Sequence, residues 1–314
     1  MGESLVVLSA VLPVFCIIGL GGLLRRANWL TEEADRSILR VTINVLVPFL
    51  ILDSTLGNQA LHQLGNLLLA PLAGIATALA GFFLAHQAAS LAGLREARQR
   101  RTFALAAGLY NYGYVPIPLA LILYGQETVG VLFVHNVGVE VALWTAGLAL
   151  LKGAPPGREW HRIFNLPLLA IVVGQALNLS GGDQLVPQFM LSIFKMLGQC
   201  AIPMGMILIG ATIADEIHEF HSQAAWRTMG VACLLRQLIL PAFFLLLARW
   251  LPCSLELKRV ILLQAAMPAA VFPVVMAKHY DGDTATALRV VISSSALSLV
   301  TTPLWIRLGT YFLF

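Results

Sequence analysis

Long apolar segments alternate with short polar connections along the whole chain. Each segment approaches the roughly 20 residues that a helix needs to cross the hydrocarbon core of a bilayer. The expected segments are 5–24, 38–57, 67–92, 102–124, 128–151, 164–181, 188–213, 226–250, 258–279 and 284–308. The pattern therefore predicts an all-α membrane protein with ten transmembrane helices.

Proline and tyrosine positions recur along the chain at a nearly constant spacing. The pairs are Pro13 and Pro167, 154 residues apart, Pro48 and Pro203, 155 apart, and Tyr124 and Tyr280, 156 apart. Such a spacing is typical of a duplicated chain. Because each half holds five segments, the second half must enter the membrane from the opposite side, which predicts an inverted repeat. We expect a first repeat at 1–152, a cytoplasmic linker at 153–163 and a second repeat at 164–314.

The composition favours the bilayer as the solvent of this chain. The sequence is 58% hydrophobic and 11% charged, with a mean hydropathy of +0.81, whereas soluble domains carry about 25% charged residues. With both termini outside, fourteen of the twenty Lys and Arg residues fall in inner connections, which is the expected bias. The net charge of +4 comes from arginines beside the membrane, so we expect lipid and not nucleic acid as a partner.

Two of the expected segments, 102–124 and 258–279, contain closely spaced prolines near their centres. Proline lacks an N–H and breaks a helix, and a break at this depth is tolerated only where it is buried in protein or lines a cavity. Matched breaks in two halves indicate a transport site, and the N-termini of the half-helices suit an anion. The alternative is a pair of proline kinks with no function. The candidate substrate-binding residues are Asn111, Tyr112, Gly113, Pro116, Pro118, Asn136, Glu140, Gln264, Met267, Pro268, Pro273, Asn44 and Gln199.

Two charged residues lie inside expected segments. Glu140 is a candidate proton carrier, with Asn136 one helical turn away on the same face; the alternative is a structural carboxylate between helices. Arg236 either pairs with Glu140, attracts an anionic substrate, or extends to a polar edge. His135 is expected to be a packed histidine.

For the remaining polar residues, a structural role explains the sequence at least as well as a functional role. Asn44 and Gln199 either face the substrate or satisfy carbonyls freed by proline. Ser293, Ser294 and Ser295 favour close helix packing. The segment HEFH at 218–221 is expected to be a solvated loop and not a metal site.

The chain has no nucleotide-binding or nucleophile motif. The four cysteines have neither disulfide nor zinc spacing. We therefore expect no enzyme activity, no catalytic residue, no cofactor and no metal.

Three stretches resemble the auxin efflux carrier family. GLYNYGYVPIPLALILYG (108–125) and AAMPAAVFPVVMAKHYDGDTATALRVVISSSALSLVTTPLW (265–305) resemble its two crossover regions, and LPVFCIIGLGGLLRRANWLTEEA (12–34) resembles its first helix and loop. The doubled proline at Pro116 and Pro118 exceeds the family pattern, so which of the two marks the crossing is open. The short linker matches the bacterial malate and malonate permease branch.

The resemblance implies a fold similar to that of bile acid–sodium symporters. It implies a scaffold formed by 5–57 and 164–213, which usually forms a homodimer, and a mobile transport domain formed by 67–151 and 226–308. The expected function is elevator-type transport of a small carboxylate across the cytoplasmic membrane. Proton coupling, sodium coupling and a ligand sensor that does not transport remain the alternatives.

Overall fold

The computed structural model describes residues 3–155, 157–216 and 223–314, and every regular element in these ranges is a helix or a helical turn. The only strand-like pairing among them is an isolated antiparallel bridge between Tyr110 and Ala269. The helices are α1 (Glu3–Arg26), α2 (Glu32–Val41), α3 (Val47–Thr55), α4 (Leu64–Ala88), α5 (Ala97–Gly108), α6 (Pro116–Tyr124), α7 (Gln126–Ala142), α8 (Leu148–Lys152), α9 (Leu166–Ser180), α10 (Gln188–Glu216), α11 (Gln223–Leu234), α12 (Leu240–Trp250), α13 (Leu255–Ala266), α14 (Phe272–His279) and α15 (Thr284–Leu313).

Seven helical stretches in the described residues are long and apolar enough to cross a membrane. They are Ser9–Arg26, Glu32–Thr55, Leu64–Ala88, Gln126–Lys152, Gln188–Asp215, Trp226–Trp250 and Thr284–Leu313. Helix α9 is apolar but shorter. The two remaining expected segments are each divided, 102–124 between α5 and α6 and 258–279 between α13 and α14. The prediction of an all-helical membrane protein is therefore confirmed.

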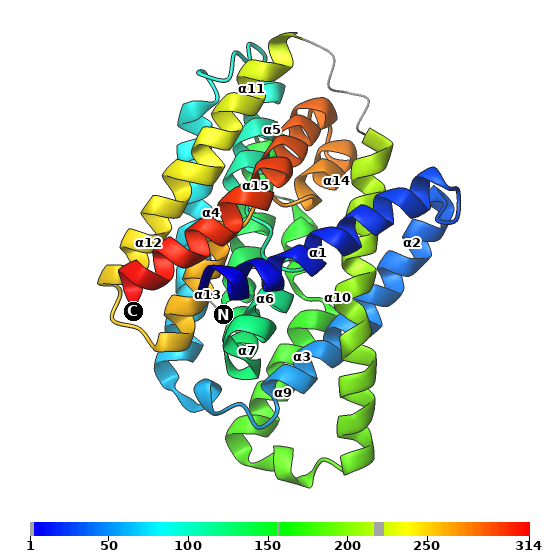
Figure 1. Ribbon diagram of the computed structural model, residues 1–314, viewed down its shortest axis with the longest axis vertical. Coiled ribbons are helices and arrows are strands. Elements are labelled where there is room, and N and C mark those ends of the chain that lie inside the picture. Colours follow the sequence, from blue (N-terminus) through cyan, green and yellow to red (C-terminus); the bar gives the residue numbers. More distant parts are fainter. Residues whose placement is uncertain (1–2, 156, 217–222) are drawn as a thin grey trace.

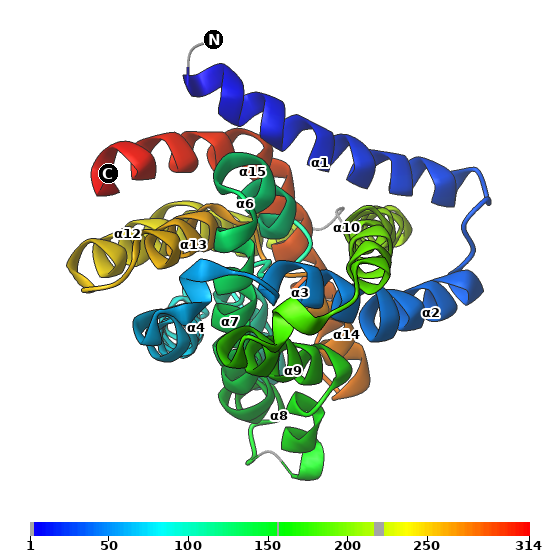
Figure 2. The same cartoon turned by 90° about the horizontal axis from the view of Figure 1, so that it is seen from below.

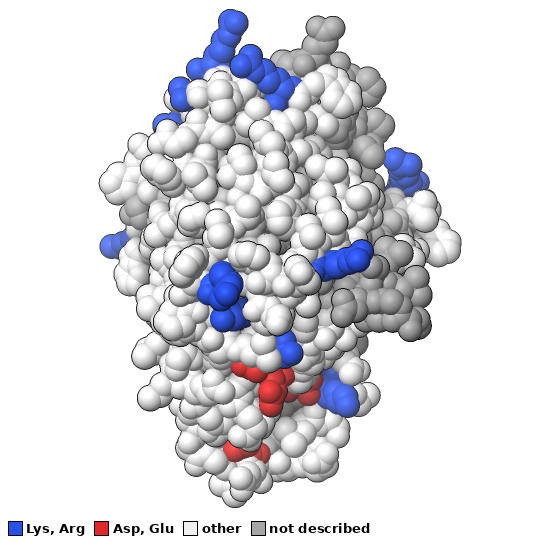
Figure 3. All heavy atoms as spheres, turned by 60° about the vertical axis from the view of Figure 1, so that its left-hand side comes forward, with Lys and Arg blue, Asp and Glu red and all other residues white. Residues whose placement is uncertain are grey.

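The helices form two groups by their contacts. Helix α1 packs along α10, and α3 packs against both α10 and α9. In the other group α4 packs along α7 and α5, α11 packs on α15, and α12 packs on α13. Figures 1 and 2 show α7 near the middle of the molecule, with α4 on one side and α9 and α10 on the other. In the space-filling view basic side chains gather at the upper end of one face, while in its lower part acidic side chains lie beside further basic ones (Figure 3).

Two long helices contain π-helical turns just before a proline. One turn covers Thr42–Leu46 before Pro48, and another covers Leu235–Ile239 before Pro241. Proline donates no hydrogen bond and clashes with the carbonyl four residues earlier, and a widened turn accommodates both effects. The kink expected at Pro48 is thus absorbed without ending the helix. A third π-helical turn, Leu143–Gly147, follows α7 and precedes α8 without a proline.

The contact between α1 and α10 depends on glycines. A Cβ added at Gly210 of α10 would overlap the Ile18 carbonyl of α1, and one added at Gly21 would overlap the Ile207 carbonyl of α10. Small residues at these positions let the two backbones approach closely, which is how helices associate without a hydrophobic driving force.

We predict that Gly210→Leu lowers the stability of the protein by about 1–3 kcal/mol, because the side chain must separate α1 from α10. Gly19→Leu is the matched control, since a Cβ at Gly19 meets nothing within 4 Å. Thermal unfolding in detergent measures both variants. An equal melting temperature for Gly210→Leu and Gly19→Leu would contradict this account of the packing.

Candidate functional site at the crossing of two interrupted helices

The site begins with two breaks in the backbone. Helix α5 ends at Gly108 and α6 begins at Pro116, while α13 ends at Ala266 and α14 begins at Phe272. Pro116 takes the first position of α6, where a missing N–H costs nothing, and this fixes where the helix resumes. Pro273 lies in the first turn of α14.

The two breaks cross and pair as antiparallel backbone. The Asn111 N–H donates to the Pro268 carbonyl at 2.8 Å, and the Ala270 N–H donates to the Leu109 carbonyl at 3.0 Å. These bonds satisfy backbone groups that the interruptions leave without a helical partner. The crossing point in the first half is therefore at Tyr110, before both Pro116 and Pro118, whereas Pro268 lies at the crossing itself.

Polar side chains from both halves of the chain meet at the Tyr112 carbonyl. Asn136 Nδ2 of α7 donates to this oxygen at 2.7 Å. Gln264 Nε2 of α13 lies 3.4 Å from the same oxygen and 3.2 Å from Asn136 Oδ1. Gln264 is fully buried and its Oε1 has no partner among the described residues. Asn111 is 7% exposed, and its Oδ1 accepts from the Gly113 N–H at 3.4 Å.

Glu140 is held by two aromatic donors. The Tyr112 hydroxyl donates to Glu140 Oε1 at 2.6 Å, and Trp144 Nε1 donates to Glu140 Oε2 at 2.8 Å. The side chain of Tyr112 binds the carboxylate, and its backbone carbonyl is part of the crossing. Tyr112 therefore links Glu140 to the crossing. Trp144 was missed from the sequence, although its position one helical turn after Glu140 was a usable signal.

The other predicted residues at the breaks are packed around this centre. Met267 and Pro268 are buried in the second break, and Pro118 is buried in α6. Gly113 and Tyr112 are half-buried. Ser294 of α15 accepts from the Ala269 N–H at 3.1 Å, which gives one of the three predicted serines a bond to the crossing.

Asn44 and Gln199 do not join this cluster. Both side chains are exposed on the surface of the described structure. Asn44 Nδ2 donates to the Arg40 carbonyl one turn earlier at 2.9 Å, which fits the alternative that it satisfies a backbone carbonyl.

Arg236 contacts the crossing but forms no ion pair with Glu140. Its guanidinium is fully buried and lies over the rings of Tyr110, at 5.5 Å, and Phe244, at 5.4 Å. Arg236 Nη1 lies 3.5 Å from the carbonyl of Gly108, the last residue of α5. A cation is favourable at the C-terminal end of a helix. His135 is fully buried beside Tyr110, as expected for a packed histidine.

The hydroxyl of Tyr110 lies 2.8 Å from Thr77 Oγ1 of α4. Tyr110 was not predicted as a site residue, because nothing in the local sequence indicates that it lies at the crossing.

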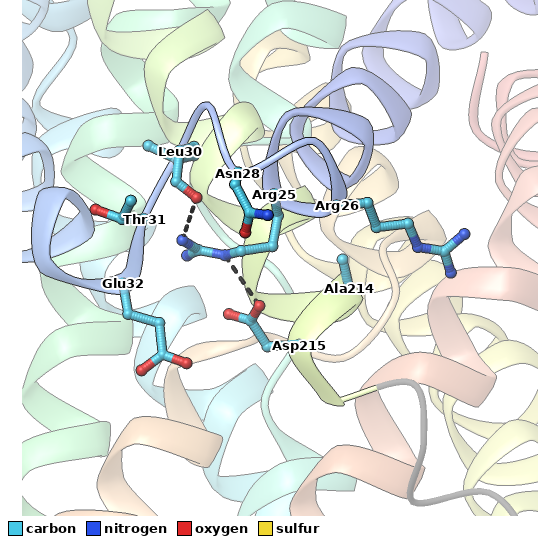
Figure 4. Close-up of a pocket in the computed structure, with 8 residues that line it drawn as sticks. All are labelled: Arg25, Arg26, Asn28, Leu30, Thr31, Glu32, Ala214 and Asp215. Atoms are coloured by element: carbon cyan, nitrogen blue, oxygen red, sulfur yellow. Dashed lines mark hydrogen bonds and ion pairs between the residues drawn. The ribbon is translucent and has the colours of Figure 1, made fainter.

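A cavity of about 450 Å³ lies away from the crossing, where the turn between α1 and α2 meets the end of α10 (Figure 4). The Arg25 side chain links these three elements. Its Nε lies 2.9 Å from Asp215 Oδ1, its Nη1 donates to the Leu30 carbonyl at 2.5 Å, and its Nη2 pairs with Asp35. Arg25 is thus paired with two carboxylates, Asp35 and Asp215, and we assign this contact a structural role.

The described part of the chain holds no group of three or more His, Cys, Asp or Glu residues that would bind a metal. The segment HEFH at 218–221 lies outside the described residues. The four cysteines are free, and Cys16 and Cys200 are exposed on their helices.

Comparison with known proteins identifies a matching family model and two related transporters. A family model described as "Membrane transport protein" matches residues 6–161 and 157–306. An uncharacterized transporter of Methanothermobacter thermautotrophicus is 29% identical over 301 residues, which are 95% of this chain and 96% of the relative. An uncharacterized transporter of Methanocaldococcus jannaschii is 22% identical over 206 residues, 64% of this chain and 66% of the relative. The chain therefore belongs to the membrane transport protein family, the auxin efflux carrier family that its sequence resembles, and is a membrane transporter.

Proposed function

We propose that the protein is a secondary transporter of a small organic carboxylate and that it works by an elevator-type movement. The observation that carries the proposal is the crossing, where Asn111 pairs with Pro268 and where Asn136 and Gln264 converge. Interrupted helices that cross inside an apolar fold, with polar side chains around them, are the usual architecture of a transporter site.

The contacts between helices support an inverted repeat of ten spans, with α5–α6 and α13–α14 each counted as one. Pairings in the first half have counterparts in the second half. Helices α4 and α7 pack together as α11 and α15 do, α4 and α5 as α12 and α13 do, and α5 packs on α15 as α13 packs on α7. Equivalent pairings are expected where two halves have the same internal fold.

An anionic substrate fits the donors at the crossing. Helices α6 and α14 both begin beside it, and the N-terminus of a helix carries partial positive charge. The side-chain amides of Asn111, which is 7% exposed, and of Gln264, which is fully buried, add further hydrogen-bonding groups. A carboxylate offers two acceptor oxygens, and hydrogen bonds from N–H donors to an ionised acceptor are stronger than those to a neutral one.

We assign the two groups of helices to a scaffold (α1 to α3, α9 and α10) and a transport domain (α4 to α8 and α11 to α15). Bonds across the boundary join α3 to the start of α7. Gln126 Nε2 donates to Asp53 Oδ2 at 2.9 Å, and Asn58 Nδ2 lies 3.3 Å from the Glu127 carbonyl. An elevator movement breaks these bonds, so they stabilise the state described here.

Glu140 is the residue we propose for proton coupling. The ionised carboxylate accepts from both Tyr112 and Trp144. A proton on Oε1 would require the Tyr112 hydroxyl to turn from donor to acceptor. The backbone carbonyl of Tyr112 accepts hydrogen bonds from Asn136 and Gln264 at the crossing. A change in the hydrogen bond of the Tyr112 hydroxyl therefore affects a residue that forms part of the crossing.

We predict that Gln264→Ala raises the KM for carboxylate uptake about tenfold or more, since a hydrogen bond to a charged group is worth about 1.5–3 kcal/mol. The measurement is uptake of radiolabelled malonate into proteoliposomes. Gln188→Ala, at an exposed position that begins α10, is the control and should leave the KM unchanged. If the wild type takes up none of a panel of mono- and dicarboxylates, the proposed substrate class is wrong.

We predict that Glu140→Gln abolishes the dependence of transport rate on pH, because glutamine keeps the shape of the side chain but cannot exchange a proton. Glu127→Gln is the matched control, since Glu127 is an exposed carboxylate on the same helix. Rates are compared across a series of pH values, with sodium replaced by choline in a parallel series. If Glu140→Gln keeps the wild-type pH profile, Glu140 is not the coupling residue, and a loss of wild-type transport in choline would favour sodium coupling.

A further inference from the structure

A second cluster of charged and aromatic residues lies where the linker between the two halves meets the end of α14. Lys152 ends α8, Arg162 lies in the helical turn Arg158–Ile163, and Tyr280 follows α14. The Lys152 ammonium lies 5.9 Å from the centre of the Tyr280 ring, and the Arg162 guanidinium lies 5.8 Å from the same centre. Both cations therefore lie within cation–π distance of the same aromatic ring.

One carboxylate already occupies part of this cluster. Glu159 Oε1 accepts from Lys152 Nζ at 2.8 Å. This hydrogen bond from Lys152 lowers the pKa of the Glu159 carboxyl, so Glu159 is ionised at neutral pH. Arg162 forms no ion pair among the described residues, and its guanidinium lies over the rings of Trp144 and Tyr280. The cluster thus carries two positive charges and one negative charge.

One polar atom in the cluster has no partner. The Tyr280 hydroxyl is buried and without a hydrogen bond among the described residues. A buried hydroxyl without a partner costs free energy, which an acceptor from a ligand would recover. A carboxylate supplies that acceptor and also the missing negative charge.

Trp144 connects the cluster to the crossing. The Arg162 guanidinium lies 5.4 Å from the centre of the Trp144 ring, and Trp144 Nε1 donates to Glu140 at 2.8 Å. Trp144 is 6% exposed and also packs edge-on against Phe272 at the start of α14. The indole therefore separates the charged cluster from Glu140.

We propose that Lys152, Arg162 and Tyr280 form an entry site for an organic carboxylate, in which Glu159 holds Lys152 until the ligand displaces it. The ligand carboxylate would bind the two cations and accept from the Tyr280 hydroxyl. The site lies on the side that the proposed topology places inside the cell. This inference rests on the proposed function, because it takes the carboxylate to be the transported substrate.

The test is binding of radiolabelled malonate to the purified full-length protein in detergent, in a Gln264→Ala background that weakens the crossing site. Glu159→Gln removes the competing carboxylate and should tighten binding about tenfold, whereas Lys152→Gln combined with Arg162→Gln should weaken it about tenfold or more. Arg158→Gln is the matched control, because Arg158 is an exposed cation in the same linker. Malonamide, the neutral analogue, should not compete.

The proposal is overturned if malonate binds the double variant as tightly as the Gln264→Ala parent, or if Glu159→Gln leaves binding unchanged or weaker. The Glu159→Gln result decides the question even where the double variant does not fold. Transport in proteoliposomes separates the two proposals. Malonate binding that depends on Lys152 and Arg162, without uptake of any carboxylate by the wild type, would retain the binding site and reject the transport function.

Discussion

Two antiparallel backbone hydrogen bonds, from Asn111 to Pro268 and from Ala270 to Leu109, allow two helices to stop inside an apolar fold. A helix that ends at this depth leaves N–H and C=O groups that lipid cannot satisfy, and each such group costs several kcal/mol. Each break supplies the partners that the other lacks. Neither break is therefore stable alone, and the two halves of the chain must associate before either half can form its part of the site.

The charges near the crossing follow from this arrangement. Arg236 lies beside Gly108 at the end of α5, where the helix dipole favours a cation, and Glu140 binds Tyr112 a few residues further along the same break. Opposite charges thus contact one short unwound segment at two places, Arg236 at its start and Glu140 at Tyr112, without pairing with each other. A change in the protonation of Glu140 alters only one of these contacts, so the segment would respond while Arg236 keeps α5 in place.

Much of the helical framework is predictable from the sequence, because long apolar segments and prolines act locally. The prolines also indicated which two segments would be interrupted. They did not indicate where the backbone crosses, since pairing at Tyr110 depends on a partner that is more than 150 residues away in the chain. The sequence also did not predict that Asn44 and Gln199 are exposed. Their segments are apolar on all sides, so the periodicity does not identify the buried face.

The proposed repeat is symmetric in its helices but not in its polar groups. At the 156-residue spacing of Tyr124 and Tyr280, the position equivalent to Gln264 is Gly108, and the position equivalent to Glu140 is Ala296. The Gln264 amide and the Glu140 carboxylate therefore have no counterpart in the other half, although each half contains a break. Two alternating sites of equal chemistry would require both groups in both halves. We infer that a single set of polar groups serves both sides of the membrane, which requires the helices that carry it to move relative to the rest of the protein.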